Sequence, residues 1–543
     1  MTLNRLRPLR GLLLAAALLS ACSQQYSTED QKELEPAYGL GREAAADASA
    51  EPAFPGAADP APASRENYAV VHENPFLEAR RNPLSTFAID VDRASYANVR
   101  RFLLQNRQLP PPDAVRLEEL VNYFPYQYPQ PRSGPASLNA EVAACPWNPA
   151  HRLVLVGVQG KEVASENLPP ANLVFLLDVS GSMNDPDKLP LLKESLRLLV
   201  RERLRPQDYV SIVVYAGAAG LVLPPTSGTE RETILRALDQ LEAGGSTAGG
   251  EGLRLAYEVA QQHRRPGGNN RVILATDGDF NVGEQSDADM ERLITQERAS
   301  GVFLSVLGFG QGNVQDAKME LLADKGNGNY AYIDQLGEAR RVLVQQFGGT
   351  LFALAKDVKV QVEFNPARVR EYRLLGYENR LLAAEDFNDD RKDAGELGAG
   401  QQVTALYEIV PADAPTAAAA PAVDPLKYQA TSATDAGSSP ELLTVKLRYQ
   451  EPQGSPSRLL TLPVRGARFD EPSARASDNL RWAAAVAQFG LLLRGSQHRG
   501  TASWASTQEL VSSASGPDAD GSRAEFRQLV QHAATLQGET AQH

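Results

Sequence analysis

Apolar and polar residues follow different periods along the chain, and the clearest pattern lies between about residues 170 and 350. There, short and nearly continuous apolar runs alternate with segments of helical spacing. The predicted strands are Leu173–Leu177, Tyr209–Tyr215, Val272–Ala275 and Val302–Leu307. Continuous apolar runs are typical of strands buried on both faces. This region therefore predicts an α/β fold, a doubly wound and mainly parallel sheet covered by helices.

Two flanking regions, 73–165 and 355–543, have another pattern. The first mixes helical spacing with strand-like runs, and the second begins with period-two alternation at Val358, Val360 and Val362 before turning helical after 477. Period two indicates strands with one buried face. Because the ends of a compact domain often lie close together, we expect the strands before 165 and after 355 to share one antiparallel β layer in an α+β flanking domain.

The N-terminal 22 residues predict a targeting segment. Arg5, Arg7 and Arg10 precede a short apolar run, and Leu19-Ser20-Ala21-Cys22 follows it. This pattern is typical of a secretory signal peptide. It also resembles a bacterial lipoprotein signal, which implies that Cys22 is lipidated and anchors the mature protein. Ser23, in place of Asp, then implies the outer membrane, facing the periplasm. A plain secretory signal is the alternative.

Composition adds a tether and excludes one class of partner. Residues 23–72 are rich in Ala, Glu, Pro, Asp and Ser, which predicts a disordered tether, and 411–440 predicts a flexible loop. The 543 residues carry 54 Lys and Arg against 67 Asp and Glu, a net charge of −13. This balance offers no general attraction for nucleic acid or for anionic lipid. Membrane contact is expected through the lipid anchor alone, and Cys145 is expected to be a buried apolar residue.

Oxygen-bearing side chains gather at predicted strand and helix ends in the central region. Asp178-Val179-Ser180-Gly181-Ser182 follows the first strand, Gly244-Gly245-Ser246-Thr247 precedes a helix, and Thr276-Asp277 ends a later strand. Ligands of open α/β sheets bind at this edge. Carboxylates and hydroxyls suit a hard divalent cation, most simply Mg²⁺, with Mn²⁺ or Ca²⁺ as alternatives. The same residue types also serve as helix caps, which is the structural alternative.

With these three segments the region 170–350 resembles a von Willebrand factor type A domain with an intact metal-ion-dependent adhesion site. The resemblance implies that Ser180, Ser182 and Thr247 bind the metal directly and that Asp178 and Asp277 act mostly through water. It also implies that a partner protein supplies an Asp or Glu carboxylate as the sixth ligand. The flanking regions are similar to those of bacterial von Willebrand type A lipoproteins.

Three hypotheses of function follow. The first is a lipid-anchored envelope protein that binds a partner protein through the metal. The second is an envelope scaffold whose metal is structural and is held by a carboxylate of the chain's own flanking domains. The third, a metal-dependent hydrolase, has little support because the six histidines are scattered and no nucleophile elbow or phosphate loop occurs. The sequence therefore predicts a binding protein and no enzyme.

Overall fold

The computed structural model describes residues 65–543 except 90–91, 246–248, 279, 281–286, 347–351, 393, 416–437, 453–455, 466–474, 515 and 541–543. The predicted signal peptide, most of the tether and most of the loop 411–440 lie outside the described residues. Within the described part, no helix combines the length and the apolar character that crossing a bilayer requires.

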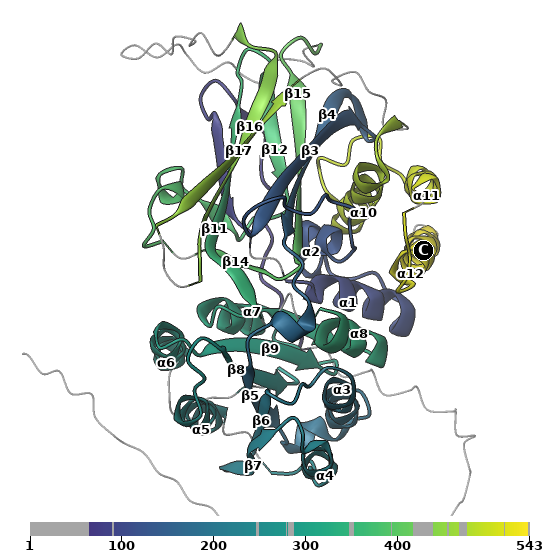
Figure 1. The fold of residues 1–543 in the computed structure, drawn as a ribbon. Coiled ribbons are helices and arrows are strands. Elements are labelled where there is room, and N and C mark those ends of the chain that lie inside the picture. Colours follow the sequence, from purple (N-terminus) through teal and green to yellow (C-terminus); the bar gives the residue numbers. More distant parts are fainter. Residues whose placement is uncertain are drawn as a thin grey trace, which may run out of the picture. The chain divides into compact units, whose positions relative to one another are not determined.

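The central region forms a sheet of six strands in the order β10-β9-β8-β5-β6-β7 (Figure 1). Neighbouring strands are parallel except for the pair β6 and β7, which is antiparallel. The mainly parallel sheet predicted for this region is confirmed, with β7 as an unpredicted edge strand. The strands are β5 (Ala171–Asp178), β6 (Tyr209–Tyr215), β7 (Ala219–Ser227), β8 (Asn269–Thr276), β9 (Phe303–Phe309) and β10 (Tyr330–Ile333).

Helices cover both faces of this sheet. Alternate residues of β5 face opposite sides, so Phe175 and Leu177 lie in one apolar cluster, and Val174 and Leu176 lie in another. The first cluster includes residues of α3 (Leu189–Glu202), α4 (Arg231–Asp239) and α8 (Leu336–Arg340, continued by a π-helical turn to Gln345). The second includes residues of α5 (Gly249–Gln262), α6 (Asp287–Ala299) and α7 (Asp316–Lys325). The region is thus doubly wound, as predicted.

Strands from both flanking regions build two antiparallel sheets. In the first, β4 of the N-terminal region pairs with β15 of the C-terminal region, and in the second β2 pairs with β11. The first sheet contains β1 (Leu77–Glu78), β12 (Val369–Leu375), β15 (Gln402–Pro411), β4 (Asn148–Gly160) and β3 (Ala136–Cys145). The second contains β13 (Leu381–Leu382), β2 (Leu84–Ala88), β11 (Ala353–Phe364), β16 (Glu441–Gln450) and β17 (Arg458–Arg465), with β14 (Gly395–Gly398) beside β11.

We expected the flanking strands to share one β layer, but they form two sheets that pack face to face. Side chains of both sheets meet in one apolar cluster, where the rings of Phe364 and Tyr372 stack at 3.9 Å. The residues of β4 show why a second sheet is needed: both faces of this strand are buried. Val154, Val156 and Val158 face the other sheet, whereas Leu153 and Leu155 face a layer of helices.

The helical layer consists of α1 (Ala94–Arg100, continued by a π-helical turn to Gln105), α2 (Leu117–Asn122), α10 (Asp478–Arg494), α11 (Trp504–Ser513) and α12 (Ser522–Thr540). Its core is aromatic, with Phe124, Trp482 and Phe526 in edge-to-face contact. Short 3₁₀ turns lie at Pro112–Ala114, Ser165–Asn167, Gly181–Asn184 and Glu385–Phe387.

The described chain makes specific contacts earlier than the predicted tether allows. The backbone amide of Arg65 donates to the Gly312 carbonyl at 2.8 Å, and that of Asn67 donates to the Val314 carbonyl at 2.9 Å. Glu66 forms a bidentate ion pair with Arg101, at 2.7 and 2.8 Å. The prediction of a tether as far as residue 72 is therefore wrong at its C-terminal end. Glu66 lies in a segment of biased composition, but it pairs with the buried Arg101 guanidinium.

Candidate metal centre

Asp178 is the centre of the predicted site and lies at the carboxyl end of β5, between β6 and β8. Its side chain is fully buried. The Tyr215 hydroxyl, from the last residue of β6, donates to its Oδ2 at 3.1 Å, and the Thr276 hydroxyl, from the last residue of β8, donates to the same atom at 3.2 Å. Oδ1 accepts from the Ser180 amide at 2.9 Å. The two neighbouring strand ends and the following turn therefore fix the orientation of this carboxylate.

The two serines of the motif converge beside Asp178. Their hydroxyl oxygens are 3.1 Å apart, on either side of Gly181 at the start of the 3₁₀ turn. Ser180 is buried, whereas Ser182 is exposed. A cation held by both hydroxyls would therefore have a solvent-facing side, which a metal that binds an external ligand requires.

The glycine loop before the predicted third ligand docks on the same turn. The Gly244 amide donates to the Val179 carbonyl at 2.7 Å, and the Gly181 amide donates to the Gly245 carbonyl at 3.1 Å. Gly245 has a φ of +85°, a conformation that favours glycine. Thr247 itself lies outside the described residues, so its predicted role as a ligand stays a prediction.

Asp277 directly follows β8 and is also fully buried. Its Oδ2 accepts from the Lys188 ammonium at 3.0 Å. Burial alone would raise the pKa of Asp277, but hydrogen bonds from Asn313 and Ser182 and the charge of Lys188 hold it below its ordinary value. By contrast, burial raises the pKa of Asp178 above its ordinary value, although hydrogen bonds from Ser180 oppose this effect.

The donor chemistry of these residues fits a hard divalent cation. No group of three His, Cys, Asp or Glu side chains within the described ranges is placed to hold a metal ion, so hydroxyl oxygens would have to complete the ligand set here. Ser180 and Ser182 supply two such oxygens. Asp178 and Asp277 add negative charge, and both carboxylates already accept hydrogen bonds from the protein.

The sequence did not indicate three of the residues that hold this arrangement. Tyr215 reads as the end of an apolar strand, Lys188 as a solvated lysine before a helix, and Asn313 as part of a loop. Each contacts an aspartate at least 36 positions away, with separations of 37 for Tyr215 and 89 for Lys188. Of the three, only Tyr215 has a position from which a role at the site could have been inferred, because it ends a predicted strand, and ligands bind at the ends of such strands. Cys22 lies outside the described residues, and Cys145 is buried as predicted.

Three stretches of the chain match known protein families. Residues 62–155 match a family described as von Willebrand factor, 172–346 match the von Willebrand factor type A domain, and 349–536 match the C-terminal region of the uncharacterized protein YfbK. The central α/β region is therefore a von Willebrand factor type A domain.

Two relatives and one solved structure set the scale of the similarity. The uncharacterized protein YfbK of Escherichia coli (strain K12) is 44% identical over 473 residues, which cover 86% of this chain and 80% of that protein. The uncharacterized protein sll0103 of Synechocystis is 29% identical over 198 residues, covering 36% and 46%. The structure of a von Willebrand factor type A protein from Catenulispora acidiphila matches with a TM-score of 0.39 and 17% identity, covering 75% of this chain and 92% of that one.

Proposed function

Because the chain belongs to the family of the uncharacterized Escherichia coli protein YfbK and contains a von Willebrand factor type A domain, we propose that it is a protein-binding module. Its site would hold a divalent cation, most simply Mg²⁺, that grips an Asp or Glu carboxylate of a partner protein. The observation that carries this proposal is the convergence of Asp178, Ser180, Ser182 and Asp277 at one edge of the sheet.

The same geometry favours binding over hydrolysis. With hydroxyls as direct ligands, a cation keeps most of its positive charge and attracts an anionic ligand strongly. A hydrolytic site would also need a carboxylate free to accept a proton from water. Asp178 accepts hydrogen bonds from Tyr215 and Thr276, and Asp277 accepts one from Lys188. We therefore propose that the protein is not an enzyme, and a hydrolase screen with and without Mg²⁺ tests this.

The experiment that tests adhesion compares matched variants. The immobilised protein is exposed to solubilised envelope proteins in Mg²⁺ or in chelator, and the retained proteins are identified by mass spectrometry. Asp178→Asn keeps the side-chain shape and removes the charge, and Asp239→Ala, an exposed carboxylate on α4, is the control. We expect a partner that is retained by wild type and Asp239→Ala in Mg²⁺ only. Retention of the same proteins by Asp178→Asn or in chelator would refute metal-dependent adhesion.

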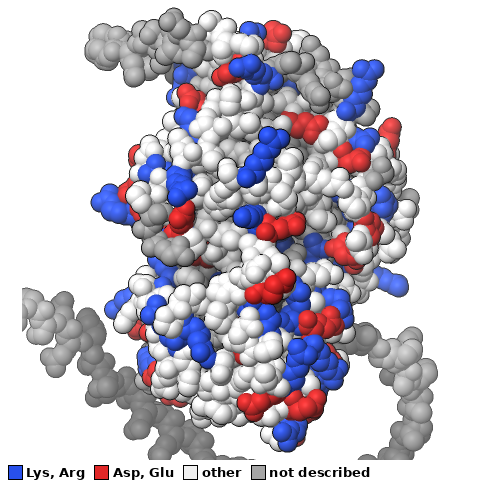
Figure 2. All heavy atoms as spheres, in the orientation of Figure 1, with Lys and Arg blue, Asp and Glu red and all other residues white. Residues whose placement is uncertain are grey.

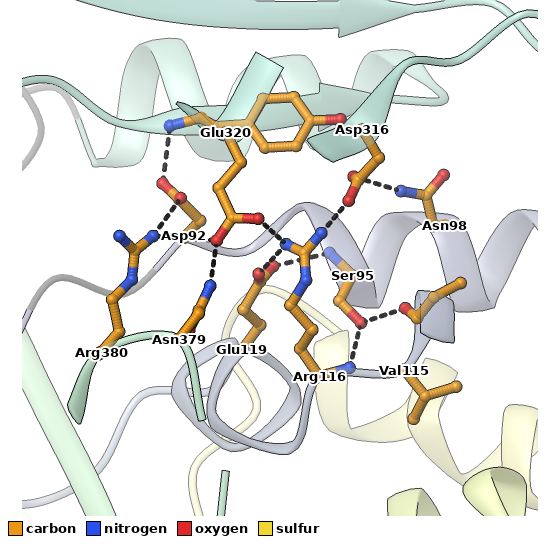
Figure 3. Close-up of polar contacts among 12 residues, drawn as sticks. Asp92, Ser95, Asn98, Val115, Arg116, Glu119, Asp316, Glu320, Asn379 and Arg380 are labelled. Atoms are coloured by element: carbon orange, nitrogen blue, oxygen red, sulfur yellow. Dashed lines mark hydrogen bonds and ion pairs between the residues drawn. The ribbon is translucent and has the colours of Figure 1, made fainter. Parts of the chain in front are cut away.

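A second candidate function, an envelope scaffold with a structural metal, is favoured by how firmly the domain is joined to its flanks. Figure 3 shows Arg116, which precedes α2, in contact with Asp316 and Glu320 of α7 and with Glu119. All four side chains are buried. In a scaffold the metal would stabilise the fold, so chelator would lower the melting temperature strongly. In an adhesion site with an open position the decrease would be small.

We also propose that the mature protein is anchored to the cell envelope, at the periplasmic face of the outer membrane, through lipid on Cys22. On the face drawn in Figure 2, Lys and Arg are interspersed with Asp and Glu, so this face presents no basic patch that would attract anionic lipid. Radiolabelled palmitate should enter the wild type and not Cys22→Ser, and fractionation should find only the wild type in the outer membrane. Equal labelling of both would refute lipidation at this residue.

A further inference from the structure

Lys188 is a buried cation at the edge of the candidate metal centre. It precedes α3 in the turn that follows the serines, and its side chain is 6% exposed. Its ammonium lies 3.0 Å from Oδ2 of Asp277 and 3.8 Å from an Asp185 carboxylate that is 67% exposed. Solvent screens the contact with Asp185, so the buried Asp277 is the dominant partner.

The fold makes specific room for this lysine. Its methylene groups pass against Gly310, which follows β9 and has a φ of +72°. A Cβ on Gly310 would lie 2.4 Å from Cε and 2.6 Å from Cγ of Lys188. The Gly310 amide donates to the Asp187 carbonyl at 3.2 Å and so holds the two loops together. The ammonium is thereby directed at Asp277.

We propose that Lys188 weakens the binding of the metal at this site and strengthens the binding of the partner's carboxylate. This inference rests on the proposed function. Asp178 and Asp277 bring two negative charges, and Lys188 cancels one. A divalent cation then leaves a net charge of +1 at the site, whereas without Lys188 the charges would cancel. Like charges repel in a partly buried site, so Lys188 weakens the binding of the metal and strengthens the attraction for an incoming carboxylate.

The contact has a second consequence for Asp277 itself. Oδ2 is occupied by the ammonium, and hydrogen bonds from Asn313 and Ser182 also reach this carboxylate. An oxygen that is engaged in this way is a poor direct ligand, because the metal would have to displace an ion pair to reach it. Lys188 would therefore keep Asp277 out of direct contact with the ion, while its carboxylate still accepts a hydrogen bond from Ser182 and so orients that hydroxyl.

Calorimetric titration of the full chain with Mn²⁺, alone and then in the presence of acetate as a carboxylate probe, tests this proposal. Lys188→Met keeps an unbranched side chain that is one atom shorter, and it removes the charge. The matched control is Lys193→Met on α3, whose ammonium donates to the Asp239 and Leu241 carbonyls at 2.9 and 3.0 Å. We expect Lys188→Met to bind Mn²⁺ roughly tenfold more tightly than wild type and to lose the enhancement by acetate, whereas Lys193→Met behaves as wild type.

The outcomes separate this inference from the proposed function. If wild type and Lys188→Met bind Mn²⁺ equally, the role of Lys188 is refuted while the metal site stands. If neither binds Mn²⁺, both are refuted. Binding by Lys188→Met alone would support the inference in its strongest form, with the ammonium excluding the ion. Should Lys188→Met fold poorly, Lys188→Gln serves in its place, because it also removes the charge but keeps a polar end group, and the same tightening is expected.

Discussion

The sharpest test of the electrostatics concerns Glu118, a buried residue of α2 in the helical layer. Its side chain is 4% exposed, and Oε2 has no hydrogen-bond partner in the described part of the chain. Burial raises the pKa of Glu118 to about 7, the charge of Glu378 adds to this effect, and Arg494 opposes it. Glu118 is therefore protonated in the folded protein at pH values where an exposed glutamate is charged.

The pKa difference fixes both the sign and the size of the effect on stability. In the unfolded chain the pKa returns to about 4.5. Between these values only the folded state holds the proton, so the free energy of unfolding falls as the pH rises through this window. At 1.36 kcal/mol per pKa unit the loss amounts to about 3 kcal/mol. Glu118→Gln mimics the protonated form, so we expect it to match wild type near pH 4.5 and to exceed it by about 3 kcal/mol at pH 8.

Urea denaturation at pH 5, 6, 7 and 8, followed by circular dichroism, measures this difference directly. Glu232→Gln, an exposed position on α4, is the control and should leave the curve unchanged at each pH. A stability difference between Glu118→Gln and wild type that is the same at pH 5 and pH 8 would show that Glu118 does not titrate in this window. The reasoning from burial would then be wrong.

Three further changes test other parts of the structure. Asp316→Asn should lower the free energy of unfolding by about 3 kcal/mol, because it leaves a buried guanidinium without one of its partners; denaturant unfolding beside the surface variant Asp239→Ala measures this. Gly278→Ala should cost about 2 kcal/mol and weaken Mn²⁺ binding in calorimetry, since Gly278 has a φ of +110° and a Cβ there would lie 2.6 Å from the Asn313 carbonyl oxygen. In a Cys22→Ser protein, Cys145 should react with a thiol reagent only after unfolding, because it is buried and burial raises its pKa; fast labelling of the folded protein would contradict its burial.

The features of the fold that could be predicted are those that a short stretch of sequence determines by itself. The central strands were predicted because each is an apolar run that must be buried on both faces. The edge strand β7 was missed, since Leu221 and Val222 are half exposed and Pro224 and Pro225 follow them. The flanking strands were predicted as such, but alternation shows only that one face is buried. It does not tell which sheet that face packs against, and one layer was expected where the chain forms two.

In the candidate site, too, the contacts within one turn could be predicted, and the contacts between distant segments could not. Asp178, Ser180 and Ser182 come from one turn, so their spacing alone predicted that they converge, and their contacts confirm it. The residues that hold the two aspartates come from distant segments, and nothing in the local sequence distinguishes Lys188 from a solvated lysine. Pairings of this kind follow from which strand ends become neighbours in the sheet, and they became visible only once the order of the strands was known.

The central domain is inserted between strands of the flanking sheets, and ion pairs join it to the flanking regions. The chain leaves the flanking sheets after β4 and returns at β11, so both ends of the domain are tied to paired strands. Between these ends α7 is held by the buried Arg116, which pairs with Asp316 and Glu320 (Figure 3). The partly buried Arg380 pairs with Glu320 and Asp324. Buried ion pairs add little net stability over apolar packing, but they require one geometry. We therefore expect them to fix the orientation of the domain, so that a partner bound at the proposed metal centre would be held in a set direction relative to the flanking sheets.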